Sequence, residues 1–399
     1  MRALFSCLPG LGHFHPMVPL AQAMVGAGHQ VGFATAERFC ERVVAPAGFQ
    51  AFPAGLSPMQ VEERMASPQA GDGDAVPPVP SSDSPTDTEV GARMFAGVAG
   101  PAKVAELTRL IKAWRPTVIV HDALDFGAPV AAARAGLAWA GHSVGALQPP
   151  ELWDRAAMII APTWHEWGVD PGPAGGMFRY LYLDICPPAL QAPHIADITV
   201  ARPLRPVIFD TPRAVPVPTW VRRLPPVPTV YVTLGTVFNH TRGLFETILE
   251  GLSAEAVNVI VTVGRNRDPA EVGAQPSNVR VERYIPQSVV FPRCDLVVCH
   301  GGSGTTLAAL AHGLPLLVMP QGADQRWNGD RCAALGAGLT LYPAAVTPEA
   351  VRAATRGLLD QPSYRAAAGR IQAEINAMPG PEQAVGLIEE LAGRNRPGA

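Results

Sequence analysis

Two histidines lie two residues apart in the stretch PGLGHFHP, residues 9–16, directly after the first apolar run of the chain. Further along, Asp122 follows another apolar run, VIV. A histidine beside a carboxylate is a common general base, because the carboxylate orients the imidazole and stabilises its protonated form. The structural alternative is that His13 caps a helix begun at Pro16, while Asp122 caps the segment that follows its strand.

A glycine-rich cluster, HGGSGTT at residues 300–306, follows the apolar run LVVC. Glycines allow a ligand to approach the backbone, and the start of a helix presents free N–H groups and a partial positive charge. We expect a strand ending at Cys299, a helix starting at about Thr305, and a diphosphate at this turn. The stretch lacks the lysine of a P-loop, and Leu307 stands at the third glycine of a dinucleotide fingerprint. A tight turn without a ligand is the alternative.

Polar and aromatic side chains flank this cluster along the chain. Asp324, Gln325 and Asn328 lie in PQGADQRWN, and adjacent acid and amide groups suit hydrogen bonding to the vicinal hydroxyls of a sugar. Tyr284, in the earlier stretch RYIPQ, offers an aromatic face to a nucleobase. Taken alone, a polar loop with an N-cap and a buried strand-end tyrosine are the structural alternatives.

The surrounding sequence alternates short apolar runs with helical patterns, which is typical of βαβ units with a parallel sheet. Strands are expected, among others, at residues 2–8, 30–35, 117–124, 229–236, 295–300 and 315–320. The fold class predicted is α/β, with two Rossmann-like parallel-sheet domains that face each other across a cleft. The expected boundaries are a first domain at 1–205, a proline-rich linker at 206–227, a second domain at 228–379, and a helix at 380–399 that packs back on the first domain.

Two segments interrupt the alternation. Residues 66–92 are rich in Pro, Ser, Gly and Asp, and they predict a long mobile loop. The GDGD at 71–74 resembles a metal-binding D-x-D motif, but it lies in that loop and not at a strand end. Residues 147–194 carry aromatic side chains that either line an apolar pocket or pack in a core: Trp153, Trp164, Trp167, Phe178, Tyr180 and Tyr182.

Composition excludes several classes of protein. The 399 residues suffice for two domains, and a net charge of −3 predicts no attraction to nucleic acid or an anionic membrane. The uncharged stretch 296–323 is broken by glycines and prolines, so it predicts strand, helix and strand and no membrane span. The six cysteines are scattered and the N-terminus has no signal-peptide pattern, which predicts reduced core cysteines and a cytoplasmic protein. Cys294, Cys299 and His300 lack the further ligands of a metal site.

The motifs RYIPQ, HGGSGTT and PQGADQRWN, in this order, join GHFHP and the HD of residues 121–122 in the first half. Together they resemble the inverting GT-B glycosyltransferases that use nucleotide sugars, and most closely the actinobacterial enzymes that decorate antibiotics and other natural products. The resemblance covers nearly the whole chain. It implies transfer of a sugar from a dTDP- or UDP-sugar to a hydroxyl of a small, largely apolar acceptor, with no metal and no cofactor besides the donor itself. A homodimer is left open.

The resemblance also implies a role for each matching residue. His13 would be the catalytic base, and Asp122 would orient it. The donor-binding residues would be Tyr284 at the nucleobase, Gln287 near the ribose, Thr236, His300, Gly302, Ser303, Gly304 and Thr305 at the diphosphate, and Asp324 and Gln325 at the sugar. Many family members carry tryptophan where Tyr284 stands, so the choice of base is left open.

Three other functions remain as alternatives at this point. An oxidoreductase is one, since PGLG after a strand resembles the start of a dinucleotide site, although His15 occupies the third glycine position. A nucleotide-sugar epimerase of similar fold is the second, and it would convert the donor without an acceptor. A catalytically silent homologue that binds a partner is the third, and it would not need His13 and Asp122.

Overall fold

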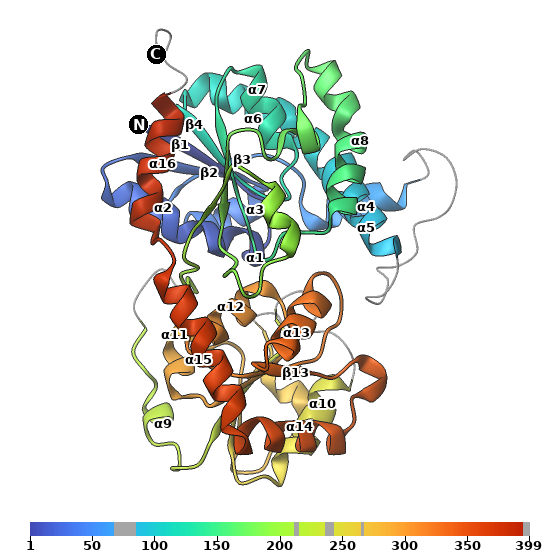
Figure 1. Cartoon of the computed structure of the whole chain (residues 1–399), viewed down its shortest axis with the longest axis vertical. Coiled ribbons are helices and arrows are strands. Elements are labelled where there is room, and N and C mark those ends of the chain that lie inside the picture. Colours follow the sequence, from blue (N-terminus) through green and yellow to red (C-terminus); the bar gives the residue numbers. More distant parts are fainter. Residues whose placement is uncertain (68–84, 211–214, 236–242, 265–266, 394–399) are drawn as a thin grey trace. The chain divides into compact units, whose positions relative to one another are not determined.

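A computed structural model describes residues 1–67, 85–210, 215–235, 243–264 and 267–393 of the chain (Figure 1). The chain divides into two compact units, and each has its own sheet. The first unit comprises Met1–Cys186, Gln191–Pro212 and Met378–Ala399, and the second comprises Pro187–Leu190 and Arg213–Ala377. The main division therefore falls inside the proline-rich stretch 206–227.

The first unit contains a sheet in the order β3-β2-β1-β4-β5-β6-β7, and its neighbouring strands are parallel. The chain runs outward from β1 to β3 on one side and from β4 to β7 on the other. The carboxyl ends of β1 and β4 therefore flank a topological switch point, where α/β sheets bind ligands. The strands are β1 (Arg2–Ser6), β2 (Gln30–Thr35), β3 (Gln50–Pro53), β4 (Val118–Asp122), β5 (Trp139–His142), β6 (Leu181–Asp184) and β7 (Ala201–Pro203).

Helices pack on this sheet because its central strands are apolar on both faces and need cover. The described helices of the first unit are α1 (Leu11–Phe14), α2 (Val18–Gly26), α3 (Glu37–Phe39), α4 (Pro58–Ala66), α5 (Pro85–Ala92), α6 (Gly100–Trp114), α7 (Gly127–Arg134), α8 (Pro150–Glu166) and α16 (Pro381–Gly393). The last of them, α16, lies against α2, so the end of the chain belongs to the first unit (Figure 1).

The second unit repeats the scheme with a parallel sheet in the order β10-β9-β8-β11-β12-β13. Its switch point lies between β8 and β11. Its strands are β8 (Thr229–Thr233), β9 (Asn258–Thr262), β10 (Val279–Glu282), β11 (Leu296–Cys299), β12 (Leu316–Val318) and β13 (Gly338–Thr340). Its helices are α9 (Thr219–Arg222), α10 (Leu244–Ser253), α11 (Gln287–Val290), α12 (Ser303–Ala311), α13 (Gln325–Ala334), α14 (Pro348–Asp360) and α15 (Pro362–Ala377). The predicted class, two parallel-sheet α/β domains, is confirmed.

The structure corrects the helix expected to begin at Pro16. Helix α1 already begins at Leu11, after Gly10 in an extended conformation, and a 3-10 turn (His15–Met17) leads into α2. His13 therefore lies within a helical turn of its own, α1, and does not cap a helix that begins at Pro16. The helix expected at about Thr305 similarly begins two residues earlier, at Ser303.

The prediction of a long loop at residues 66–92 is also wrong in part, because residues 85–92 form α5. Residues 68–84, which include the GDGD stretch, lie outside the described residues.

Most aromatic side chains of residues 147–194 pack in the core of the first unit. Trp153, Trp164 and Tyr182 are at most 4% exposed, and Phe178 stacks edge-on against both Trp153 and Tyr182. Of the two alternatives for this segment, core packing is thus the one that holds for these residues. The six cysteines are free and buried, as predicted. Within the described residues, no helix is both long and apolar enough to cross a membrane.

Candidate active site

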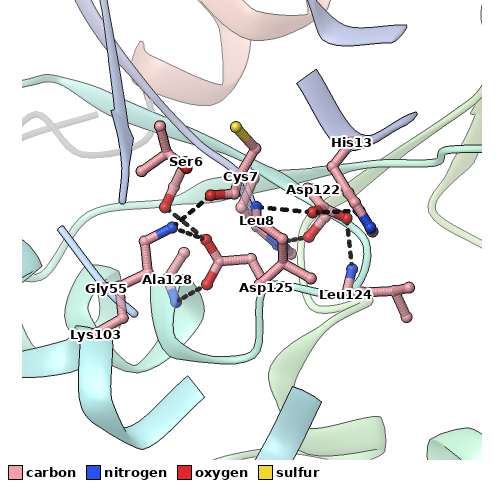
Figure 2. Close-up of polar contacts among 12 residues, drawn as sticks. Ser6, Cys7, Leu8, His13, Gly55, Lys103, Asp122, Leu124, Asp125 and Ala128 are labelled. Carbon is pink, nitrogen blue, oxygen red and sulfur yellow. Dashed lines mark hydrogen bonds and ion pairs between the residues drawn. The ribbon is translucent and has the colours of Figure 1, made fainter. Parts of the chain in front are cut away.

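His13 and Asp122 meet at the switch point of the first sheet. His13 lies in α1, directly after β1, and Asp122 is the last residue of the neighbouring strand β4. Their side chains approach to 2.9 Å between Nδ1 and Oδ2, with the histidine side chain 25% exposed and the carboxylate fully buried (Figure 2). The sequence-predicted pair is therefore in contact, with only the imidazole reaching the surface.

Backbone amides hold the Asp122 carboxylate in place. Its Oδ2 accepts a hydrogen bond from the Leu8 N–H at 3.1 Å, and its Oδ1 accepts one from the Leu124 N–H at 2.9 Å. Burial by itself raises the pKa of Asp122, but the charge of His13 and the bonds from His13, Leu124 and Leu8 outweigh it, so the pKa lies below its usual value. An ionised Asp122 can only accept hydrogen bonds, which assigns the imidazole proton to Nδ1 of His13 and leaves Nε2 as the basic nitrogen.

The second histidine of the stretch takes a different place. The ring of His15 lies 5.3 Å from that of Phe209 and 6.0 Å from that of Phe14, centroid to centroid. The predicted acid, Asp122, contacts the first histidine of the stretch, His13, at the end of β4.

A buried polar cluster that was not foreseen from the sequence lies beside this pair (Figure 2). Lys103 of α6 and Asp125 are 3% and 1% exposed, and Nζ lies 2.7 Å from Oδ2. Ser6 donates to the same carboxylate oxygen at 2.6 Å. The sequence does carry one signal: Lys103 shares a four-residue spacing with Leu107 and Ile111, so a charge lies in the apolar stripe of the helix.

In the second unit, the glycine-rich stretch 300–306 spans the turn from β11 into the start of α12, and we call this turn the cradle. Gly301 has φ +90°, and a Cβ there would lie 2.6 Å from Val318 Cγ1, so only glycine fits. Gly302 precedes α12 in an extended conformation, and no side chain of the described residues caps the helix. The N–H groups of the first turn are therefore open to an anion, and the helix dipole favours negative charge there. Gly304 is exposed, with open space where a Cβ would be.

His300 lies within this turn, held between two glycines. A Cβ on Gly302 would come within 2.6 Å of Nε2, and a Cβ on Gly235 within 2.5 Å of Cε1. His300 is 9% exposed, and burial lowers its pKa to about 4. Its Nδ1 is buried without a hydrogen-bond partner in the part of the chain that the structure describes. His300 is thus a neutral imidazole, and its Nδ1 has no hydrogen bond to any described residue.

Ser303, Asp324 and Asn328 form one hydrogen-bonded group. The Ser303 hydroxyl donates to Asp324 Oδ2 at 2.5 Å, and Asn328 Nδ2 lies 3.0 Å from the same oxygen and 2.8 Å from the Gly301 carbonyl. Asn328 is 4% exposed, so it ties the glycine turn to the loop that carries Asp324. That loop contains Ala323 at φ +54°, an unfavourable conformation that such a site can retain.

The remaining predicted donor residues are placed as follows. Gln287 Nε2 donates to Thr305 Oγ1 at 3.1 Å, which joins the RYIPQ stretch to the cradle. Tyr284 is half-buried. Gln325 is only 2% exposed, and its Oε1 accepts the N–H groups of Gln321 and Gly322, so it supports the loop beside Asp324. Its role at a sugar stays a prediction.

Thr236 lies outside the described residues.

Within the described residues there is no group of three or more His, Cys, Asp or Glu side chains arranged to hold a metal ion.

Comparison with known proteins agrees with this architecture. Family models described as "Erythromycin biosynthesis protein CIII-like" match residues 22–235 (N-terminal domain) and 246–391 (C-terminal domain). The L-demethylnoviosyl transferase of Streptomyces niveus is 32% identical, over 99% of each chain. The glycosyltransferase SsfS6 of Streptomyces sp. SF2575, complexed with thymidine diphosphate, is 26% identical with a TM-score of 0.80, over 98% of this chain and 99% of that one.

A third relative, spinosyn rhamnosyltransferase SpnG complexed with spinosyn aglycone, is 27% identical with a TM-score of 0.81, over 98% of this chain and 100% of that one.

Fold and site together define a GT-B glycosyltransferase. The chain belongs to the erythromycin biosynthesis protein CIII-like family, whose members act on natural products. The epimerase and the silent homologue are not favoured.

Proposed function

We propose that the chain is an inverting, metal-independent glycosyltransferase that moves a sugar from a dTDP- or UDP-sugar to a hydroxyl of a small, largely apolar natural product. The observation that carries this proposal is the contact of His13 Nδ1 with the buried Asp122 at 2.9 Å. An oriented imidazole whose proton lies on Nδ1 has a basic Nε2, which suits deprotonation of an acceptor hydroxyl. No protein nucleophile is needed, and a single displacement at the anomeric carbon inverts its configuration.

In the proposed reaction, Nε2 of His13 takes the proton as the acceptor oxygen attacks the anomeric carbon. The bond from that carbon to the diphosphate breaks, and the nucleoside diphosphate leaves. Asp122 stabilises the imidazolium that forms. The cradle supports the negative charge of the leaving group through the open N–H groups of α12, the neutral His300 and the hydroxyl of Thr305.

The choice of donor and acceptor class follows the relatives. SsfS6 has been solved in complex with thymidine diphosphate, and SpnG in complex with spinosyn aglycone. We infer that the nucleotide of the donor lies at the cradle of the second unit, with its base near Tyr284 and its sugar near Asp324. The acceptor would use the first unit, where His13 lies.

A donor screen tests the proposed function. The purified chain would be incubated with a panel of dTDP- and UDP-sugars, with and without apolar polyketide and phenolic acceptors. Release of the nucleoside diphosphate is followed, and product configuration is read by NMR. We expect transfer with inversion from at least one of the donors. Retention of configuration, or conversion of the donor to an epimer, would contradict the proposal.

Substitution of Thr305 should weaken donor binding more than substitution of Ser303. The Thr305 oxygen already accepts from Gln287, which leaves its proton for a phosphate, whereas the Ser303 proton is given to Asp324. A charge-assisted hydrogen bond contributes roughly 1.5–3 kcal/mol, so Thr305→Ala should raise the Kd for dTDP by about tenfold or more. Calorimetry on both variants gives the ranking. Equal affinities in Thr305→Ala and wild type would place the diphosphate elsewhere.

Donor binding should not depend on a divalent cation. In the proposal above, the N-terminus of α12 and the polar side chains of the cradle bind the negatively charged diphosphate, so no cation is needed to neutralise it. We expect the same Kd for dTDP, within a factor of about two, in excess EDTA and in millimolar Mg²⁺, where a change of that size is near the resolution of such a titration. Binding that disappears in EDTA and returns with Mg²⁺ would refute this part of the proposal.

A further inference from the structure

We infer that the buried ion pair of Lys103 and Asp125 positions the His13–Asp122 pair, acting through the single peptide group that joins Cys7 to Leu8. Lys103 would thus be a positioning residue for the reaction. The inference deepens the proposed function and rests on it for the role of His13 as base, although the positioning itself is a separate property.

The contacts form a continuous chain (Figure 2). Lys103 Nζ donates to the carbonyl oxygen of Cys7 at 2.9 Å. The other end of that same peptide group is the N–H of Leu8, which donates to Asp122 Oδ2 at 3.1 Å. This is the carboxylate oxygen that contacts His13 Nδ1 at 2.9 Å. One peptide group therefore connects the ammonium of Lys103 to the acid of the catalytic pair.

Such a connection has two physical consequences. A positive charge at the carbonyl end polarises the peptide group, and hydrogen bonds in a chain strengthen one another, so the Leu8 N–H becomes a better donor. The peptide group is also fixed at both ends, so it cannot rotate away from Asp122. The carboxylate then keeps Oδ2 aimed at the imidazole, while Leu124 holds the other oxygen.

Asp125 keeps the lysine in this position. Its Oδ2 lies 2.7 Å from Nζ and accepts the Ser6 hydroxyl, and its Oδ1 accepts the Ala128 N–H at 3.3 Å, at the start of α7. The aliphatic stem of Lys103 packs closely against Gly55, at φ +92°, where a Cβ would lie 3.2 Å from Cδ. The ammonium therefore has little freedom to move away from the Cys7 carbonyl.

A role in stability alone is a weaker explanation of this pair. Two charges that are 3% and 1% exposed have lost most of their hydration, and apolar replacements of such buried pairs are often neutral or stabilising. The bond to Cys7 is what an apolar pair would lack. It links this cluster to Asp122, the carboxylate that contacts His13.

The test compares two variants of the full chain labelled with ¹⁵N-histidine. Lys103→Met combined with Asp125→Asn removes both charges together and breaks the link to Cys7. Ser6→Ala is the matched control, because it removes a bond to the same Asp125 oxygen but leaves Lys103 on Cys7. The ring nitrogens of His13 are assigned by their loss in His13→Gln, and their shifts report the tautomer.

We expect wild type and Ser6→Ala to hold His13 as a single Nδ1–H tautomer at neutral pH. The double variant should show a mixture of tautomers. In an Asp122→Asn background, adding Lys103→Met and Asp125→Asn should not change the tautomer populations of His13 any further. A general loosening of the fold would change them in that background as well. A folded double variant that keeps the single tautomer overturns the inference.

A second pair of substitutions guards against failure to fold. Lys103→Gln with Asp125→Asn keeps a polar side chain at each position, but the glutamine is one atom shorter and cannot reach the Cys7 carbonyl as the lysine does. The same mixture of tautomers is expected, and retention of one tautomer overturns the inference here too.

Kinetics separate this inference from the proposed function. With a donor and acceptor from the screen above, the folded double variant should lose roughly tenfold to a hundredfold in kcat, as expected for a small misplacement of a catalytic group, with the Kd for dTDP unchanged. If His13→Ala transfers sugar normally while the tautomer results hold, the role of the base is wrong and the positioning stands.

Discussion

Replacement of His13 by alanine is expected to reduce kcat for sugar transfer by roughly 10²–10⁴, which is the usual contribution of a general base. The imidazole is the group that Asp122 orients, and its side chain is 25% exposed, so it can reach a substrate. The nucleotide is proposed to bind in the other unit, so the Kd for dTDP should hardly change. Steady-state kinetics and calorimetry on the same preparation measure both quantities.

Three further variants give this result its controls. Asp122→Asn should lose less than His13→Ala, and the two together should lose little more than His13→Ala alone, because the residues act as a unit. His15→Ala is the control for the neighbouring histidine, whose ring contacts Phe14 and Phe209. An inactive His15→Ala beside an active His13→Ala would mean that the wrong histidine was chosen.

The pairing of His13 with Asp122 was predictable because it depends on topology and not on local detail. Each residue follows an apolar run, and the ends of parallel strands meet at one edge of a sheet. The sheet order then places β1 beside β4, with Ser6 opposite His121 in the register. The glycine-rich turn could also be predicted from the sequence. Gly301 has a positive φ, and a Cβ on Gly302 would collide with His300, two residues away in the chain.

Other features depended on contacts that a pattern does not contain. The helical turn at Leu11 was missed because Pro16 is a strong start signal, yet Gly10 ends the extended segment well before it. Lys103 lies 96 residues from Cys7 in sequence, so nothing local predicts their bond. The burial of Gln325 also follows from tertiary packing. In the sequence, Asp324 and Gln325 are simply two adjacent polar residues, and nothing there indicates that the second is buried.

The cradle can be tested through its shape, with Gly302→Ala. Gly302 has φ −61° and ψ 142°, values that alanine adopts without strain, so the backbone should not change. The new methyl group would lie 2.6 Å from His300 Nε2, closer than atoms can approach, and the buried imidazole would have to move. The loss of a hydrogen bond to a charged diphosphate should raise the Kd for dTDP by about tenfold to a hundredfold.

The effect should run entirely through His300, and a cycle of variants shows whether it does. Once His300→Ala has removed the ring, the methyl group of Gly302→Ala has room, so the double variant should bind dTDP as His300→Ala does. Gly369→Ala, on α15 of the same unit, adds the same methyl group where no atom of the described residues lies within 4 Å, and it should bind dTDP like wild type. If the double variant binds more weakly than His300→Ala, the methyl group blocks the nucleotide directly. If Gly302→Ala binds like wild type, the imidazole is not part of the diphosphate site.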